Sequence, residues 1–467
     1  MTLRKAHHKT KAGCTTCKKR RIKCDESRPI CYNCSRRSLD CTYPQLPQKA
    51  GSGGQVLVFS KDAGTRPQQP AKAISPPVLL DTLSQTGLLE GVPNSLIPMY
   101  KKLLHHFVVE TSTTVAPNSQ DVWPRAVPQL TSSHGFVLDG VFALTSLHLS
   151  RLTSSETERK LHADIANARL NRGLVPYRKT LENVTNENAE GLFSFSLTTT
   201  AFILIIGADE HKALIESLVC DSATSHCRQD HIQEAVAQST RVLRCLRGSL
   251  VILVPCWEQV STGIIGAIVK RDWWPLPNPH LPEAIEEDAK LHALEKMWMF
   301  SGRRYEYYFD TLSTALLRLR HSFALASQLT IREGHDVGKL SDWTLVAEWA
   351  THISFGYVDL LERQTIEAWI ILAHWAILVH RAEQSPETWW IKNMSHNLVS
   401  TAALVVGESK RHLLEWPARS VGVDLDRLWA HSELERPASS DPSSALSEML
   451  SITDSIPRVS ELPMTDV

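Results

Sequence analysis

The chain has 467 residues, of which 43% are hydrophobic and 21% charged, a composition typical of a protein that is globular for most of its length. Its 50 basic and 50 acidic residues balance, which argues against a nucleic-acid-binding protein when the chain is taken as a whole. The balance hides an asymmetry: residues 1–50 hold 13 Lys or Arg and 3 Asp or Glu, a charge of +10 that leaves −10 for residues 51–467. The sequence therefore predicts a basic end that binds a polyanion, attached to an acidic body.

The N-terminal residues are charged and lack the apolar stretch of a secretory signal, so no oxidising compartment is expected. No unbroken apolar run reaches the roughly 18 residues needed to cross a bilayer, the best candidates being residues 368–379 and 202–206. We therefore expect a soluble protein with no membrane span.

Cysteines are concentrated near the N-terminus, where the pattern C-x2-C-x6-C occurs twice with a six-residue joint. The C-x2-C pair can place two thiolates on one metal, and the third cysteine closes the site. Six ligands cannot fill two separate tetrahedra, so two thiolates would have to bridge two Zn ions. A segment of about thirty residues has too small a core to fold alone, and metal binding would supply its folding energy. The six predicted zinc ligands are Cys14, Cys17, Cys24, Cys31, Cys34 and Cys41.

The cysteines allow two other interpretations. A disulfide framework would require secretion, and a RING- or LIM-like site would require a histidine within the spacing. Residues 14–41 instead resemble, without a departure in spacing, the binuclear zinc cluster of fungal transcription factors. The resemblance implies Cys14 and Cys31 as bridging thiolates, Cys17 and Cys24 as the remaining ligands of one zinc, and Cys34 and Cys41 as those of the other.

A short basic helix is predicted between the second and third cysteines. Cys17, Arg20, Arg21 and Cys24 recur at helical spacing, so the metal can hold one side while the other side chains project outwards. The resemblance implies that this helix lies in the DNA major groove, with Arg21 as the principal base-contacting residue and Arg20 beside it. An arginine suits guanine because its fork can donate to O6 and N7 together.

The other cations of the cluster are predicted to contact DNA phosphates, which position a protein without specifying sequence. Alternatively, the basic run serves only as a nuclear-import signal or as a solvated surface, and import can coexist with DNA binding. The predicted phosphate contacts are Lys18, Lys19, Lys23, Arg36 and Arg37.

Composition also divides the chain. Residues 10–44 are the predicted DNA-binding domain, and residues 45–81 a flexible linker, since residues 44–80 hold six Pro and four Gly. No sustained heptads follow the cluster, so dimerisation is compatible with the sequence without being predicted by it. Residues 82–430 are expected to form a large all-α regulatory domain, and residues 431–467 an acidic disordered tail.

Helical periodicity supports this mostly α class. Ser155 and Glu158 form a capping box that opens a helix with Leu161, Ile165 and Ala168 on one face. Alternating strand patterns are few. The other predicted helices are residues 103–108, residues 232–246 with a stop at Gly248, and the buried stretch 358–379.

Several body segments, including residues 123–128, 143–148 and 372–377, resemble the regulatory domain of the sterol-uptake-regulator branch of the same family. That branch implies a helical domain that can hold a small apolar ligand such as a sterol. Alternatively, the tryptophans between residues 369 and 390 simply pack in the core.

No catalytic pattern accompanies the histidines of the body, which lack H-E-x-x-H, G-x-S-x-G, P-loop and G-x-G-x-x-G motifs. We therefore expect structural histidines and no enzyme, and buried thiols for the four later cysteines. The histidines concerned are His105, His106, His148, His374 and His380.

From residue 432 the chain has seven acidic and two basic residues with apolar ones between them, which is typical of an amphipathic activation segment or of a featureless solvated tail. We predict a nuclear, sequence-specific transcription factor for RNA polymerase II genes. It would bind CGG-like or sterol-element-like duplex DNA, contact the transcription machinery through the tail as an activator, and control a secondary-metabolite gene cluster or sterol-related genes. The alternative is a zinc-stabilised adaptor for RNA or protein without sequence-selective DNA binding.

Overall fold

The chain divides into two compact units, Met1–Arg66 and Pro67–Val467. The computed structural model describes residues 15–20, 24, 32–35, 37, 39, 94–115, 117, 119, 121–219, 225–273, 276–299, 307–335 and 337–430. The predicted linker (45–81) and the predicted acidic tail (431–467) lie outside these residues. What the sequence indicates about them stays a prediction.

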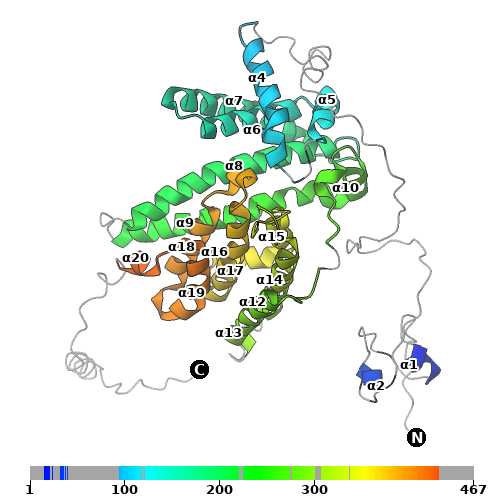
Figure 1. Ribbon diagram of the computed structural model, residues 1–467, viewed down its shortest axis with the longest axis vertical. Coiled ribbons are helices and arrows are strands. Elements are labelled where there is room, and N and C mark those ends of the chain that lie inside the picture. Colours follow the sequence, from blue (N-terminus) through cyan, green and yellow to red (C-terminus); the bar gives the residue numbers. More distant parts are fainter. Residues whose placement is uncertain are drawn as a thin grey trace, which may run out of the picture. The chain divides into compact units, whose positions relative to one another are not determined.

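The first unit contains two short helices, α1 (Thr15–Lys19) and α2 (Tyr32–Ser35), which contact each other. In the second unit the described residues are mostly helical, and their strand-type pairing is limited to an isolated bridge between Thr330 and Leu340. The mostly α prediction is therefore confirmed (Figure 1). The helices of the second unit are α4 (Ile97–Val109), η1 (Thr111–Thr114), α5 (Trp123–Ser133), α6 (Phe136–Leu152), α7 (Glu156–Leu181), α8 (Ala189–Val219), α9 (Ser225–Gly248), α10 (Leu250–Thr262), α11 (Gly266–Val269), α12 (Pro282–Ala293), α13 (Lys296–Met299), α14 (Phe309–Leu329), α15 (Leu345–His352), α16 (Phe355–Glu362), α17 (Ile366–Glu383), η3 (Pro386–Ile391), α18 (Met394–Val406), η4 (Glu408–Lys410), α19 (Arg411–Val421) and α20 (Leu425–Trp429).

The long helix α8 joins two hydrophobic cores. Its first half, including Phe195, packs into a core with α4 to α7 and α10, and its second half, including Leu218, packs into a core with α9, α14 and α17. Figure 1 shows α6 and α7 on one side of α8 and α12 to α19 on the other. The second unit is thus organised around one helix that belongs to both cores.

By length and composition alone, α8 is apolar enough to cross a membrane, with a mean hydropathy of 1.8 over an 18-residue window. No long unbroken apolar run marks α8 in the sequence, because serines and threonines interrupt its apolar stretch. Of that window, 61% is buried inside the protein, which is the placement of a core helix.

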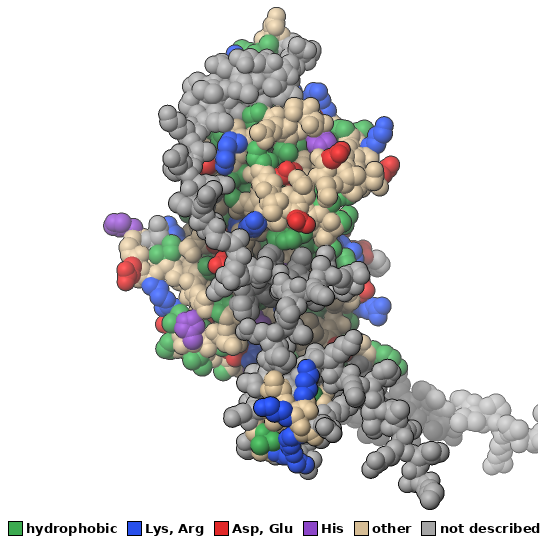
Figure 2. All heavy atoms as spheres, turned by 90° about the vertical axis from the view of Figure 1, so that its right-hand side faces the viewer, with side chains coloured by type: hydrophobic (Ala, Val, Ile, Leu, Met, Phe, Trp, Pro, Cys, Tyr) green, Lys and Arg blue, Asp and Glu red, His purple; other side chains and the backbone are tan. Residues whose placement is uncertain are grey.

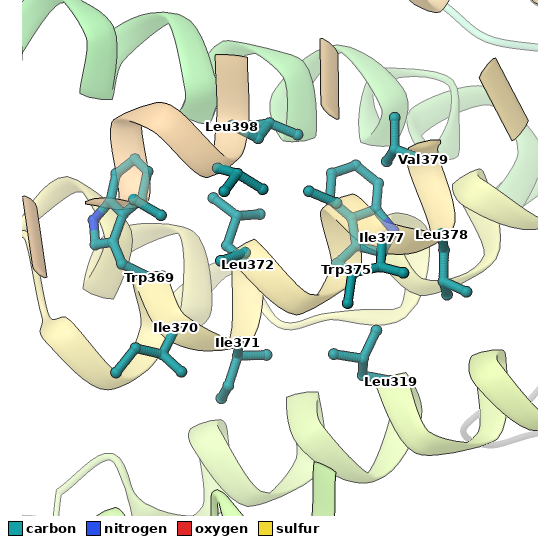
Figure 3. Packing of buried hydrophobic residues seen from close by; sticks show 14 of the residues in the cluster. Leu319, Trp369, Ile370, Ile371, Leu372, Trp375, Ile377, Leu378, Val379 and Leu398 are labelled. Atoms are coloured by element: carbon teal, nitrogen blue, oxygen red, sulfur yellow. The ribbon is translucent and has the colours of Figure 1, made fainter. Parts of the chain in front are cut away.

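The second core is built around α17. Trp369, Leu372 and Trp375 of this helix are fully buried, and Figure 3 shows them between Leu319 of α14 and Leu398 of α18. A helix that is apolar on all sides needs partners on all sides, which α14, α18 and α19 provide.

The predicted continuous helix over 358–379 is wrong, because the chain forms α16 and α17 with a break between them. Gln364 has a φ of 54°, in the left-handed region that ends a helix. The break lets α16 fold back onto α17, where the Tyr357 hydroxyl donates to the Ala368 carbonyl at 2.7 Å. The four consecutive polar residues from Glu362 to Thr365 coincide with the break, and the prediction of one helix extended across them.

The N-cap at the start of α7 is confirmed: the Glu158 amide donates to the Ser155 hydroxyl at 3.4 Å, and the helix begins at Glu156. The Ser155 amide donates to the Thr153 hydroxyl at 3.2 Å, in place of the Glu158 carboxylate that a capping box uses. The predicted buried face of α7 is wrong. Leu161 is 54% exposed, whereas Ala166 and Gly173 are buried. Gly173 is inside because a Cβ there would lie 2.6 Å from a ring carbon of Phe195 on α8 and 3.1 Å from Asp139 Cβ on α6, so a larger side chain does not fit.

Candidate zinc and DNA-binding site

Three predicted zinc ligands form the interior of the N-terminal unit. Cys17, Cys24 and Cys34 are 1%, 2% and 0% exposed. Among the residues of this unit whose side chains the structure describes, no other one is buried, and Leu39 is 37% exposed. The interior of the described part is therefore made of sulfur rather than hydrocarbon, which is how a segment too small for an apolar core is stabilised by metal.

The duplicated cysteine pattern corresponds to two similar local structures. Cys17 lies in α1 and Cys34 lies in α2, so the second cysteine of each C-x2-C pair is held on a short helix. After each cysteine the chain turns through backbone hydrogen bonds, from the Arg20 amide to the Thr16 carbonyl at 3.1 Å and from the Leu39 amide to the Cys34 carbonyl at 3.0 Å. Contact between the two helices brings the halves of the repeat together.

The remaining predicted ligands, Cys14, Cys31 and Cys41, lie outside the described residues. Because half of the set falls there, the described part of the chain shows no group of three His, Cys, Asp or Glu that could hold a metal. The donors that are described fit zinc, since buried thiolates are the ligands that structural zinc sites use.

The described surface around these cysteines is cationic. Lys18, Lys19, Arg20 and Arg37 are exposed, and the described part of this unit contains no Asp or Glu. Figure 2 shows the Lys and Arg side chains gathered on this small unit. Exposed lysines and arginines of this kind produce a positive potential that attracts a polyanion. The other predicted DNA contacts, Arg21, Lys23 and Arg36, lie outside the described residues.

Two of the histidines considered as catalytic candidates have structural partners. The ring nitrogen Nδ1 of His148 lies 3.0 Å from the Thr111 hydroxyl, and its ring stacks on Trp389 at 4.5 Å between centroids. His374 Nδ1 lies 2.7 Å from the Ile370 carbonyl oxygen. Burial lowers the pKa of His148 to about 4, and that of His374 likewise to about 4. Both are therefore neutral packing residues at physiological pH.

The helical unit contains two spaces that bear on the predicted apolar ligand. The first, between α8, α9 and α18, is lined by residues such as Leu204 and Leu398 and measures about 10 Å³, the size of one water. The second is a cleft of about 890 Å³ beside α8, α17, α18 and α20, with charged side chains such as Lys392 and Arg427 in its wall. The sequence gives no sign of this cleft, because the residues that line it come from distant helices and share no motif.

Residues 12–50 match the family model described as the fungal Zn(2)-Cys(6) binuclear cluster domain. The match contains all six predicted cysteines, so the chain carries this domain, and a domain of this type binds two zinc ions. The predicted cofactor and the family resemblance are confirmed at this level.

The chain is also similar to individual curated proteins. It is 31% identical over 194 residues to the Zn(2)-C6 fungal-type transcription factor afumD of Aspergillus fumigatus, covering 40% of this chain and 45% of the relative. A Zn(2)-C6 fungal-type transcription factor of Gibberella zeae is 24% identical over 91% of this chain and 88% of the relative. Sterol uptake control protein 2 of Candida albicans is 59% identical over 156 residues, 32% of this chain and 19% of the relative. The chain thus spans less than half of the first and about a fifth of the third.

Proposed function

We propose that this chain is a DNA-binding transcription regulator in which the N-terminal unit binds duplex DNA and the helical unit regulates it. The observation that carries the proposal is the sulfur interior of the N-terminal unit, formed by Cys17, Cys24 and Cys34, beneath exposed lysines and arginines. The names of the relatives, which are fungal-type transcription factors, support the same class.

Individual roles follow from residue chemistry. The six cysteines hold two zinc ions, which cross-link the segment and so supply its folding energy. Arg21 contacts guanine and Arg20 lies beside it, while the neighbouring cations contact phosphates. The exposure of Arg20 and Arg37, on the two halves of the repeat, supports contacts from both halves. In this proposal the phosphate contacts are Lys18, Lys19, Lys23, Arg36 and Arg37.

A selection of random duplexes with the full zinc-loaded chain at fixed salt tests the proposal. We expect enrichment of a CGG-like triplet or of a related element. Arg21→Ala should retain two zinc ions per chain and lose the preference between selected and scrambled sites, a discrimination of about 1–3 kcal/mol for one bidentate contact.

Arg4→Ala is the matched control, because Arg4 lies before the first cysteine. It should weaken binding to all duplexes equally and flatten the salt dependence. Enrichment of no duplex sequence, with binding to RNA or to an acidic protein instead, would favour the adaptor function over the proposed one.

The finer predictions belong to the same proposal. The chain is a nuclear activator of RNA polymerase II genes that acts through residues 431–467, and truncation after residue 430 should abolish reporter activation while specific DNA binding persists. Its relatives include a sterol uptake control protein and the C6 finger domain transcription factor hasF of Aspergillus fumigatus. We propose sterol-related genes or a secondary-metabolite gene cluster as the targets, the first supported by the name of the sterol uptake control protein, and genome-wide occupancy distinguishes the two.

A further inference from the structure

The two hydrophobic cores of the helical unit are held together by more than α8. Apart from the contacts of α8 itself, the main contact in the described chain between helices of the first core and helices of the second is that of η1 with η3. η1 follows α4 on the side of the first core, and η3 connects α17 to α18 in the second. The chain also passes between the cores where α9 ends and α10 begins. The contact of η1 with η3 is therefore a non-covalent link between two cores that are otherwise joined by continuous chain.

Two neighbouring indoles of η3 bind the same residue of η1. Trp389 Nε1 donates to the Thr114 hydroxyl at 3.0 Å, and Trp390 Nε1 donates to the Thr114 carbonyl, also at 3.0 Å. The Trp389 ring stacks on His148 of α6, whose Nδ1 atom lies 3.0 Å from the Thr111 hydroxyl. Trp390 packs against both cores. Two directed hydrogen bonds and one ring stack thus fix η3 to η1.

The η1 side of this contact is polar although it is buried. Thr111 and Ser112 are 0% exposed and Thr114 is 8% exposed, while Trp389 and Trp390 are partly exposed. Polar groups that separate can form hydrogen bonds with water instead, whereas apolar side chains that separate gain no such partner. Opening this contact therefore costs less than opening either core, since both cores consist of apolar side chains.

Both elements of the contact are short and irregular. η1 is four residues of 3-10 helix, and within η3 the backbone of Thr388 departs from helical geometry, with φ −94° and ψ 31°. Asn393, just before α18, has a φ of 68° in the left-handed region. The Thr388 hydroxyl ties η3 to the end of α17 by donating to the Ala382 carbonyl at 2.8 Å. Short segments of this kind, with few backbone hydrogen bonds of their own, are the parts of a protein that open locally.

We propose that η1 and η3 form a clasp, a conformational switch that opens as one event while both cores stay folded. In the closed arrangement the indoles of Trp389 and Trp390 bind Thr114, as the structure shows. In the open arrangement these groups bind water, and the cores are joined through α8 and through the passage from α9 to α10. The clasp gives the helical unit two arrangements of its cores, and any partner that prefers one of them shifts the balance. The proposal does not depend on DNA binding by the N-terminal unit.

Amide hydrogen exchange of the full zinc-loaded chain, measured by mass spectrometry with residue resolution, tests the proposal. The Thr113 amide, which donates to the Glu110 carbonyl at 3.3 Å, reports on η1, and the Thr388 amide, which donates to the Ser385 carbonyl at 3.1 Å, reports on η3. We expect both amides to exchange faster than amides in the middle of α6 and α17. Trp389→Phe removes one donor of η3 and should speed exchange at Thr113, on the opposite element, about three- to tenfold. Amides of α6 and α17 should be unaffected.

The reciprocal change is made on η1. Thr114→Val removes the hydroxyl that accepts from Trp389, and it should speed exchange at Thr388 by a similar factor. The Thr114 hydroxyl also donates to the Thr111 carbonyl at 2.7 Å, but this bond lies within η1, so its loss alone does not reach η3. Thr114→Ser keeps the hydroxyl and should leave exchange at Thr388 close to that of the unchanged chain.

Trp298→Phe is the matched control. The Trp298 indole also donates to a hydroxyl at 3.0 Å, that of Ser313, but this bond lies on the side of the second core alone. Its loss should leave exchange at Thr113 unchanged. If neither Trp389→Phe nor Thr114→Val changes exchange on the opposite element, or if amides of α6 and α17 accelerate by the same factor, the proposal is overturned.

Discussion

Arg247 is expected to hold the end of α9 to the end of α15. Its side chain is 8% exposed, and its Nη1 group donates to the carbonyls of Ala350 at 3.1 Å and Thr351 at 3.2 Å, and also to that of Ile353. The guanidinium lies over the Phe355 ring, 4.5 Å from its centroid. Replacing Arg247 by Ala would leave the last carbonyls of α15 without this donor.

The magnitude follows from these contacts. A hydrogen bond from a charged donor contributes about 1.5–3 kcal/mol, and the three carbonyls share one nitrogen, so together they count as about one such bond. The contact with an exposed aromatic ring adds about 0.5–1 kcal/mol. We expect Arg247→Ala to lower the free energy of unfolding of the helical unit by about 2–4 kcal/mol.

Urea unfolding of the full chain, followed by tryptophan fluorescence, measures this loss as a shift of the midpoint. Arg244→Ala is the control one turn earlier on α9: Arg244 is 53% exposed and pairs with Glu362 at 2.5 Å, so its removal should cost at most about 1 kcal/mol. Arg247→Lys should recover part of the loss, because it keeps the charge and loses the fork. If Arg247→Ala costs no more than Arg244→Ala, the assigned role of Arg247 is refuted.

Three further predictions concern packing, pH and metal. Gly173→Ala should destabilise the helical unit by about 1–3 kcal/mol, because a Cβ there would lie 2.6 Å from a ring carbon of Phe195. Gly135→Ala, where a Cβ would meet nothing within 4 Å, should leave the urea midpoint nearly unchanged. Equal shifts of the urea midpoint for the two variants contradict this prediction. Since burial lowers the pKa of His148 and His374 to about 4, both stay neutral in the folded chain while the unfolded chain takes up protons near pH 6.5. Their stabilisation is complete above about pH 6.5 and is lost as the pH falls towards 4, by up to about 1.4 kcal/mol per pH unit for each, and a urea midpoint that stays constant over this window argues against the assignment. Removing zinc with a chelator should abolish specific duplex binding and leave the far-ultraviolet circular dichroism of the helical unit, with recovery on adding zinc back; specific binding that persists in chelator rules out the zinc-dependent fold.

The zinc-binding segment could be recognised from the sequence because its chemistry is local. The six predicted zinc ligands lie within residues 14–41, and their spacing matches a domain that binds two zinc ions. The start of α7 was predictable for the same reason, since Ser155 and Glu158 form the cap within one helical turn.

Features that depend on distant neighbours were not predictable. Four polar residues, 362–365, separate two apolar stretches; polar residues also occur within helices, so they did not reveal the left-handed turn at Gln364 or the packing of α16 on α17. The buried face of α7 holds Gly173 rather than Leu161, because Phe195 of α8 and Asp139 of α6 leave no room for a larger side chain at position 173. Periodicity describes how apolar a face is, and it contains no information about how near the next helix lies.

The amino-acid sequence by itself determined the zinc chemistry, the basic character of the first unit and the helical class of the second, because ligand spacing, charge and periodicity are properties of neighbouring residues. Only the tertiary structure decided that α8 connects two cores and that Lys392, Asn397 and Arg427 line one cleft. The physical reason is that these residues meet through the packing of distant helices, and packing depends on the shapes of all the side chains between them.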